Sequence, residues 1–104
     1  MAFDLDVGLI QSIREIGRSY AIEKIVLFGS RARGDHKPAS DIDLAIFLLP
    51  EFNCRGRVTS NFDDLDTLLK IDTIFINENI DPILLENIKK EGVSLYERAP
   101  HKDQ

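Results

Sequence analysis

The spacing of apolar residues predicts both helices and strands along this chain. Apolar side chains recur every three or four positions over residues 7–20, which is typical of an amphipathic helix. Short runs that are apolar or alternate with polar residues predict strands instead. These strands cover residues 23–28, 41–49, 71–76 and 93–96.

Two further helices are expected in the second half of the chain. One is predicted to follow a polar loop at residues 51–59 and to begin at Ser60, a residue type that caps helix N-termini. The other begins at Asp81, because aspartate is a good cap and the proline after it fits the first helical position, and it ends at Gly92. The residues of this last helix expected to face inward are Ile83, Leu84 and Ile88.

The order of these elements, α-β-β-α-β-α-β, predicts an α/β (α+β) fold with a small mixed β-sheet and helices packed on it. Strand direction stays open, because the polar loop between the first two strands allows either a hairpin or a crossover. A chain of 104 residues has room for one domain. We expect this domain to span residues 1–97 and residues 98–104 to form a disordered tail.

Composition excludes several classes of function. The net charge of −5 argues against direct binding of nucleic acid, which needs a basic face. The single cysteine, Cys54, excludes an internal disulfide and fits a reducing cytoplasm. The longest apolar run, residues 44–49, is too short to cross a membrane, and the acidic N-terminus does not resemble a signal peptide. We therefore expect a cytoplasmic protein without a membrane segment.

One motif carries most of the candidate chemistry. Gly29 and Ser30 follow a buried strand, and after ten intervening residues come Asp41 and Asp43, separated by one residue at the start of the next strand. Side chains at this spacing point to the same face, so the two carboxylates repel each other unless a cation lies between them. Mg²⁺ prefers such oxygen ligands, and a glycine-serine turn offers backbone N–H groups to the phosphates that accompany it.

Asp72 is the third candidate acid. It is the single acidic residue in an apolar strand, where a carboxylate is costly unless it is paired or binds a metal. If its strand lies beside the one with Asp41 and Asp43, the three carboxylates converge, and two metal ions could bridge them and a nucleotide. Asp72 could then also accept the proton of an attacking hydroxyl. The alternative is that Asp72 merely begins its strand and hydrogen-bonds a neighbouring turn.

The polar loop supplies candidate nucleotide-binding residues. Arg31 and Arg33 are suited to clamp phosphate oxygens, and Ser40 could hydrogen-bond a phosphate or the Asp41 carboxylate. The plainer alternatives are an ion pair with Asp35 for at least one arginine and a turn position for the serine.

Residues 27–34 followed by residues 40–44 closely resemble the minimal nucleotidyltransferases (MNT) of the DNA polymerase beta superfamily. The similarity continues through Asp72 and residues 88–96, and it is greatest to the MNT antitoxins of HEPN/MNT toxin–antitoxin pairs. This resemblance implies a nucleotidyltransferase core fold. It also implies a triphosphate at Gly29 and Ser30, and it implies metal ligands, which would be Asp41, Asp43 and Asp72.

The same resemblance implies a function. The protein would be a protein adenylyltransferase that uses Mg²⁺ to move AMP from ATP to a tyrosine of a HEPN ribonuclease toxin, with which it forms a stable complex. Two alternatives stay open. One is an antitoxin that neutralises its partner by binding alone, and the other is the catalytic subunit of a two-chain transferase acting on a small molecule.

Overall fold

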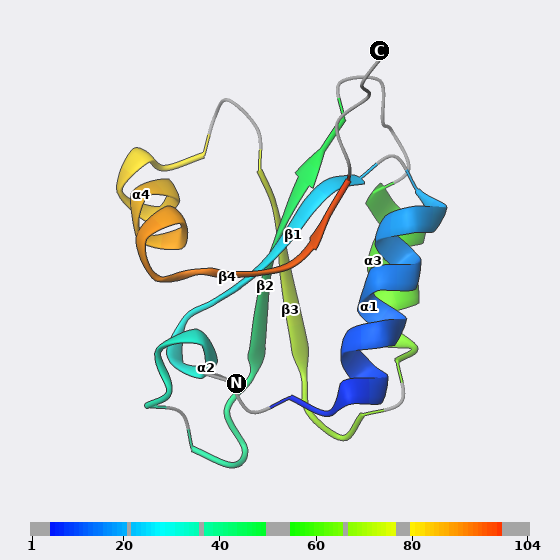
Figure 1. The fold of residues 1–104 in the computed structure, drawn as a ribbon, viewed down its shortest axis with the longest axis horizontal. Helices are drawn as coiled ribbons and strands as arrows, with labels where there is room; N and C mark the ends of the chain where they lie inside the picture. Colours follow the sequence, from blue (N-terminus) through cyan, green and yellow to red (C-terminus); the bar gives the residue numbers. More distant parts are fainter. Residues whose placement is uncertain are drawn as a thin grey trace.

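The computed structural model describes residues 5–20, 22–35, 37–49, 55–65, 67–76 and 80–98. These residues form four strands and four helices (Figure 1). The helices are α1 (Val7–Ser19), α2 (Ser30–Arg33), α3 (Arg55–Asp63) and α4 (Pro82–Glu91). The strands are β1 (Ile22–Phe28), β2 (Ile42–Leu48), β3 (Ile71–Ile76) and β4 (Val93–Glu97).

The strands form one mixed sheet in the order β3-β2-β1-β4. Strand β1 runs antiparallel to both β2 and β4, whereas β2 and β3 are parallel. The polar loop after β1 is therefore a hairpin connection, which settles the direction that the sequence left open. The parallel pair needs a crossover, and α3 lies in the segment that supplies it. The predicted mixed sheet with helices packed on it is confirmed.

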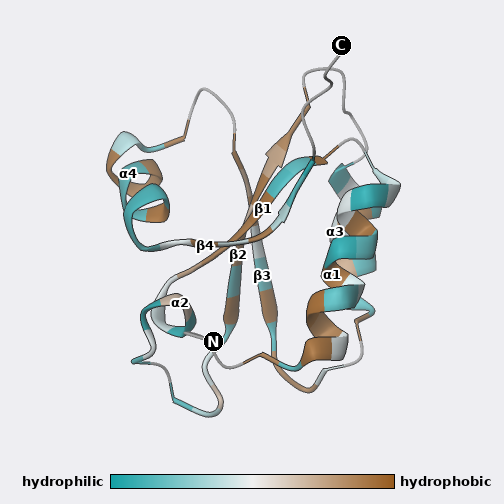
Figure 2. Cartoon of the chain, in the orientation of Figure 1, coloured by the Kyte–Doolittle hydropathy of each residue, from teal (hydrophilic) through white to brown (hydrophobic). Residues whose placement is uncertain are grey.

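Helices cover both faces of the sheet. Helices α1 and α3 lie on one face and α4 lies on the other (Figure 1). Strand β2 alternates between the two cores, because Ile42, Leu44 and Ile46 are buried with α1 and α3. Ala45 instead joins Ile88 of α4 on the opposite face. The apolar strands between the partly polar helices are visible in Figure 2. Each fully buried isoleucine or leucine contributes roughly 2 kcal/mol to folding.

The predicted boundaries of α1 and α4 are close to the observed ones, because both helices have local start signals. The Asp6 side chain accepts a hydrogen bond from the Leu9 amide at 3.2 Å, and the Asp81 side chain accepts one from the Ile83 amide at 3.0 Å. The predicted inward position of Ile83 is wrong, since 68% of this residue is exposed. Its neighbour Leu84 packs against the core instead, about 100° further round the helix.

The predicted start of the second helix, at Ser60, is also wrong. Helix α3 begins at Arg55, so residues 55–59 are helical rather than loop, and Ser60 lies inside the helix instead of capping it. Val58 and Phe62 are fully buried and four positions apart, so their packing against the core sets the helix position. The rest of the predicted loop, residues 51–54, lies outside the described residues.

The predicted disordered tail is wrong at its first residue. The Arg98 backbone donates a hydrogen bond to the Glu23 carbonyl, and its guanidinium donates others to the carbonyls of Ile22 and Tyr20. Residues 99–104 lie outside the described residues. Within the described part of the chain, no helix combines the length and apolar composition needed to cross a bilayer.

Candidate active site at the start of strands β2 and β3

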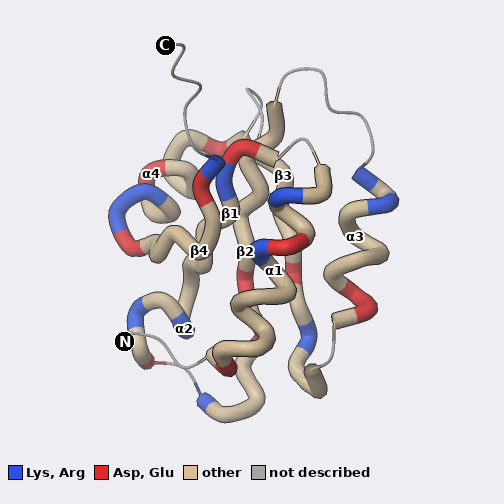
Figure 3. The backbone as a smooth tube through the Cα atoms, turned by 45° about the vertical axis from the view of Figure 1, so that its right-hand side comes forward, with Lys and Arg blue, Asp and Glu red and all other residues tan. Residues whose placement is uncertain are grey.

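The two parallel strands bring acidic residues together. Asp43 of β2 is the register partner of Asp72 of β3, and Asp41 directly precedes β2. All three residues are partly buried. The acidic positions of these neighbouring strands are coloured red in Figure 3. The expectation that Asp72 lies beside the strand bearing the other two acids is therefore confirmed.

The carboxylate of Asp43 lies in an unfavourable environment for a negative charge. Partial burial raises the pKa of Asp43 above its ordinary value, and the nearby carboxylates of Asp72 and Asp41 raise it further. The Asp43 carboxylate therefore binds a proton more readily than a free aspartate does. The site thus has a local excess of negative charge that a bound cation would relieve.

The carboxylates do not form a closed set of ligands in this conformation. Asp72 makes an ion pair with Lys70, with 3.5 Å between Oδ1 and Nζ; the Lys70 side chain is exposed and the Asp72 side chain is partly exposed. Among the described residues, no three Asp, Glu, His or Cys side chains are arranged to hold a metal ion. Their chemistry nevertheless fits Mg²⁺, which takes oxygen ligands and often retains several waters. Metal binding by Asp41, Asp43 and Asp72 therefore stays a prediction.

The glycine-serine turn lies directly against this acidic site. Gly29 follows Phe28, the register partner of Asp43 in the antiparallel pair, and it has a φ of +80°. A Cβ atom at this position would lie 2.6 Å from Oδ2 of Asp43. Ser30 is the first residue of α2, a short helix within the segment that the sequence predicted as loop. Turn and carboxylate are thus in contact, while phosphate binding by Gly29 and Ser30 stays a prediction.

Arg31 holds the loop that leads into the site. Among the described residues it is the single charged residue that is buried, with 3% of its surface exposed. Its Nε donates to the Ser40 carbonyl at 3.1 Å, and its Nη2 donates to the Pro38 carbonyl at 3.0 Å. These bonds fix the end of the loop immediately before Asp41. The sequence indicated a phosphate clamp here and gave no sign of burial, because burial depends on how the loop folds back over α2.

Arg33 and Ser40 make the contacts that the plainer alternatives predicted, an ion pair with Asp35 and a turn hydrogen bond. The exposed Arg33 guanidinium donates to Asp35 and to Glu91 of α4, each at 3.1 Å. The hydrogen bond to Asp35, followed by that to Glu91, raises the pKa of Arg33. The Ser40 hydroxyl accepts a hydrogen bond from the Lys37 amide at 2.9 Å, as a turn residue does. Nucleotide contacts by either residue stay a prediction.

Replacing Arg31 with methionine is expected to lower the free energy of unfolding by about 2 kcal/mol, because the buried hydrogen bonds to the loop are lost. The matched control is Arg33→Met, which removes an exposed guanidinium two residues away and is expected to leave the free energy of unfolding nearly unchanged, because solvent screens its ion pairs. Urea unfolding of both variants measures the difference. Equal stability of the two variants, with ATP affinity lost only in Arg31→Met, would instead support a phosphate clamp.

Solved structures with a similar fold include toxin–antitoxin complexes. The chain matches one crystallised with AMP-PNP, with a TM-score of 0.68 and 21% identity over 86% of this chain and 73% of the other. It also matches a structure of a tri-AMPylated Shewanella oneidensis HEPN toxin in complex with an MNT antitoxin, with a TM-score of 0.57 and 17% identity over 86% and 71% of the two chains. At these identities the similarity shows a shared fold.

A candidate nucleotidyltransferase from Sulfolobus solfataricus matches with a TM-score of 0.57 and 28% identity, over 88% of this chain and 79% of that one. No curated protein matches the chain. The family model for the polymerase beta nucleotidyltransferases matches residues 11–101, which is most of the sequence. This chain is therefore a member of the polymerase beta nucleotidyltransferase family.

Proposed function

We propose that this protein is a Mg²⁺-dependent protein adenylyltransferase that acts as an antitoxin. It would transfer AMP from ATP to a tyrosine of a HEPN ribonuclease toxin with which it forms a stable complex. Membership of the nucleotidyltransferase family supports the transfer reaction. The choice of nucleotide and acceptor is supported by similar folds, one crystallised with AMP-PNP and one in complex with an AMPylated HEPN toxin.

The observation that carries the proposal is the pairing of Asp43 with Asp72, directly beside the Gly29 turn. Asp41, Asp43 and Asp72 would together hold two magnesium ions. The bound magnesium would neutralise charge on the triphosphate. The adjacent turn would hold the triphosphate through Gly29 and Ser30, so that one continuous stretch of chain places the nucleotide and two of the acids, Asp41 and Asp43.

The chain's own residues would then position the reactants and accept a proton. The acceptor tyrosine oxygen bonds to the α-phosphorus of ATP, the bond to the β-phosphate oxygen breaks, and pyrophosphate leaves. The Asp72 side chain is 45% exposed and would accept the tyrosine proton. The reaction needs little covalent chemistry from the protein, so most of the rate would come from positioning and charge stabilisation.

One observation favours a second candidate, an antitoxin that neutralises its partner by binding alone. Asp72 is paired with Lys70, and the acids do not form a closed ligand set among the described residues. A protein that had lost catalysis could keep this arrangement, since the ion pair relieves part of the repulsion between the acids. The two candidates differ in whether neutralisation needs the carboxylates.

The test is the intact mass of the protein that co-purifies with this chain. Wild type is compared with the Asp41→Asn/Asp43→Asn variant, both supplied with ATP and Mg²⁺. We expect added AMP on the partner with wild type alone, together with equal amounts of bound partner. An unmodified partner bound equally by both proteins would reject the transferase and support neutralisation by binding. A modified metabolite with an unmodified partner would identify a two-chain transferase acting on a small molecule.

A further inference from the structure

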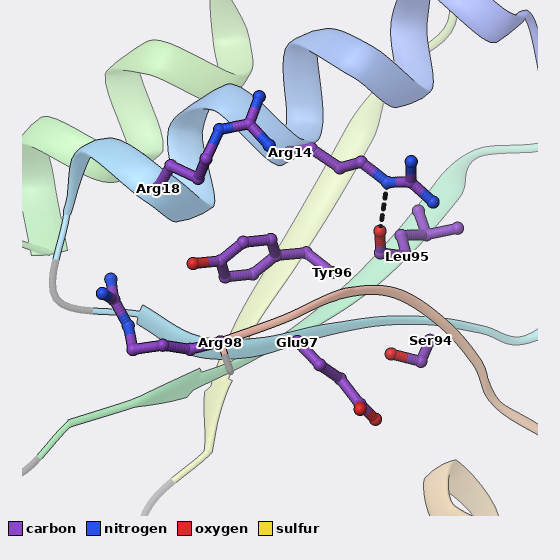
Figure 4. A pocket seen from close by; sticks show the side chains of 7 residues that line it. All are labelled: Arg14, Arg18, Ser94, Leu95, Tyr96, Glu97 and Arg98. Atoms are coloured by element: carbon purple, nitrogen blue, oxygen red, sulfur yellow. Dashed lines mark hydrogen bonds between the residues drawn. The ribbon is translucent and has the colours of Figure 1, made fainter. Parts of the chain in front are cut away.

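A basic hollow opens between α1 and the edge strand β4 (Figure 4). It has a volume of about 780 Å³. Arg14 and Arg18 line it from α1, while Tyr96 and Arg98 line it from β4 and the residue that follows. We refer to these four residues as the arginine hollow. Figure 4 shows the Tyr96 ring between the three arginine side chains.

The floor of the arginine hollow is fixed by packing. A Cβ atom on Gly17 of α1 would lie 2.6 Å from the Tyr96 ring, so the missing side chain is what allows the ring to lie against the helix. The Tyr96 ring also packs against the core beneath α1. A held aromatic side chain loses little conformational entropy on binding, which favours its use as an anchor for a partner.

The arginines around this floor are also held in place. Arg14 Nε donates to the Leu95 carbonyl at 2.8 Å (Figure 4). Arg98 donates to the carbonyls of Ile22 and Tyr20 at 3.0 and 2.7 Å. Backbone carbonyls orient these guanidinium groups without cancelling their charge. Both arginines are therefore placed before any partner arrives.

The arginine hollow is a positive surface on an acidic protein. Arg18 is paired with Glu15 at 2.6 Å, and Glu97 at the rim is paired with Lys24 at 4.0 Å. Neither Arg14 nor Arg98 forms an ion pair with any carboxylate of the described residues. Two positive charges thus remain without a carboxylate partner there, although the whole chain carries a net charge of −5.

This surface does not overlap the candidate active site. Strand β4 forms one edge of the sheet, β3 forms the other, and β1 and β2 separate them. The paired carboxylates Asp43 and Asp72 lie on β2 and β3. A molecule seated in the arginine hollow would therefore leave the acids and the Gly29 turn accessible.

We propose that the arginine hollow docks an acidic segment of a protein partner. Carboxylates of that segment would pair with Arg14, Arg18 and Arg98, and an apolar side chain would lie on Tyr96. Tyrosine and arginine are the residue types that dominate the energetics of protein interfaces. The acidic charge of the rest of the chain repels a nucleic acid, with a charge on every nucleotide, more strongly than a short segment with a few carboxylates, which favours a protein as the occupant. This docking role does not depend on the transfer reaction.

The test is an NMR titration of the ¹⁵N-labelled full chain with a short peptide of aspartate and glutamate around a central phenylalanine. We expect shifts in the amide signals of Gly17 and Tyr96, with the signal of Asp43 unchanged. Arg14→Gln/Arg18→Gln should weaken binding at least about tenfold, since two charge pairs are lost. The control, Lys89→Gln/Lys90→Gln, removes the same charge from α4 and should change affinity less than about twofold.

Two further measurements test whether loss of peptide binding reflects a folding defect and whether binding depends on the carboxylates of the peptide. Arg18→Glu reverses an exposed charge without touching the Arg14–Leu95 hydrogen bond, and it should also weaken binding at least about tenfold. A peptide with glutamine and asparagine in place of the acids should not bind. The proposal is overturned if the neutral peptide binds equally well, if the acidic peptide shifts no signal around Tyr96, or if a single-stranded RNA oligonucleotide binds the arginine hollow more tightly than the acidic peptide.

Discussion

Asp43→Asn is expected to reduce AMP transfer by about a thousandfold and, at neutral pH, to make the metal-free protein more stable. Transfer falls because the variant loses a carboxylate that the proposed reaction uses. Stability rises because asparagine removes a partly buried charge that lies beside Asp72 and Asp41. The expected gain in the free energy of unfolding is about 0.5–1 kcal/mol, measured by urea unfolding in the presence of a chelator.

The stability gain should depend on pH with a definite sign. The folded state raises the pKa of Asp43 above the unfolded value of 3.8. Below the unfolded pKa both states carry the proton, so wild type and variant should be equally stable. As the pH rises through the folded pKa, the folded wild type is forced to carry the unfavourable charge and loses stability relative to the variant. The advantage of Asp43→Asn therefore develops above pH 3.8 and is complete once the pH exceeds the raised pKa of the folded state.

The control for this prediction is Asp64→Asn, which removes an exposed acid just after α3. It should leave transfer unchanged. Mg²⁺ should raise the unfolding temperature of wild type more than that of Asp43→Asn, because a ligand that binds the folded state stabilises it by mass action. An advantage of Asp43→Asn that persisted undiminished at about pH 3 would contradict the electrostatic explanation.

The features that the sequence predicted correctly depend on local patterns. Helix α1 has a regular apolar spacing, α4 has a capping aspartate, and β2 alternates with a period of two. That period alone predicts that the side chains of Asp41, just before β2, and Asp43 point to the same face. The contact between Asp43 and Asp72 needed more, because it requires β3 to pair with β2 in one particular register. No local pattern specifies that pairing. From the sequence, the convergence of the three carboxylates could be predicted only on the assumption that β2 and β3 are neighbours.

The features that the sequence missed depend on tertiary packing. The position of α3 follows from the burial of Val58 and Phe62, which outweighs the capping signal at Ser60. The role of Arg31 follows from the path of a loop that covers its side chain. An arginine beside a glycine-serine turn is typical of a phosphate site, so the local sequence predicted that Arg31 is exposed and binds a phosphate. The two arginines of the basic loop therefore differ in role. Arg31 is buried and hydrogen-bonds the loop backbone, whereas Arg33 forms ion pairs at the surface.

Gly29→Ala is expected to reduce transfer by about a hundredfold and to lower the free energy of unfolding by about 1–2 kcal/mol. Two physical causes act together. A φ of +80° is unfavourable for any residue with a Cβ atom, and this Cβ would lie 2.6 Å from Oδ2 of Asp43. The backbone, the carboxylate or both must move apart. Turnover is sensitive to such a displacement, because shifting a reacting group by about 1 Å can cost a hundredfold in rate.

Gly56→Ala is the matched control, since it makes the same substitution in helix α3, where a Cβ atom would meet nothing within 4 Å. It should leave transfer unchanged and stabilise the protein by about 0.5–1 kcal/mol, because alanine favours the helix over the unfolded chain. Urea unfolding and the intact mass of the modified partner measure both effects for the two variants. If Gly29→Ala lost stability but kept full turnover, the turn would serve the fold alone, and the close approach of Gly29 to Asp43 would have no part in placing the nucleotide.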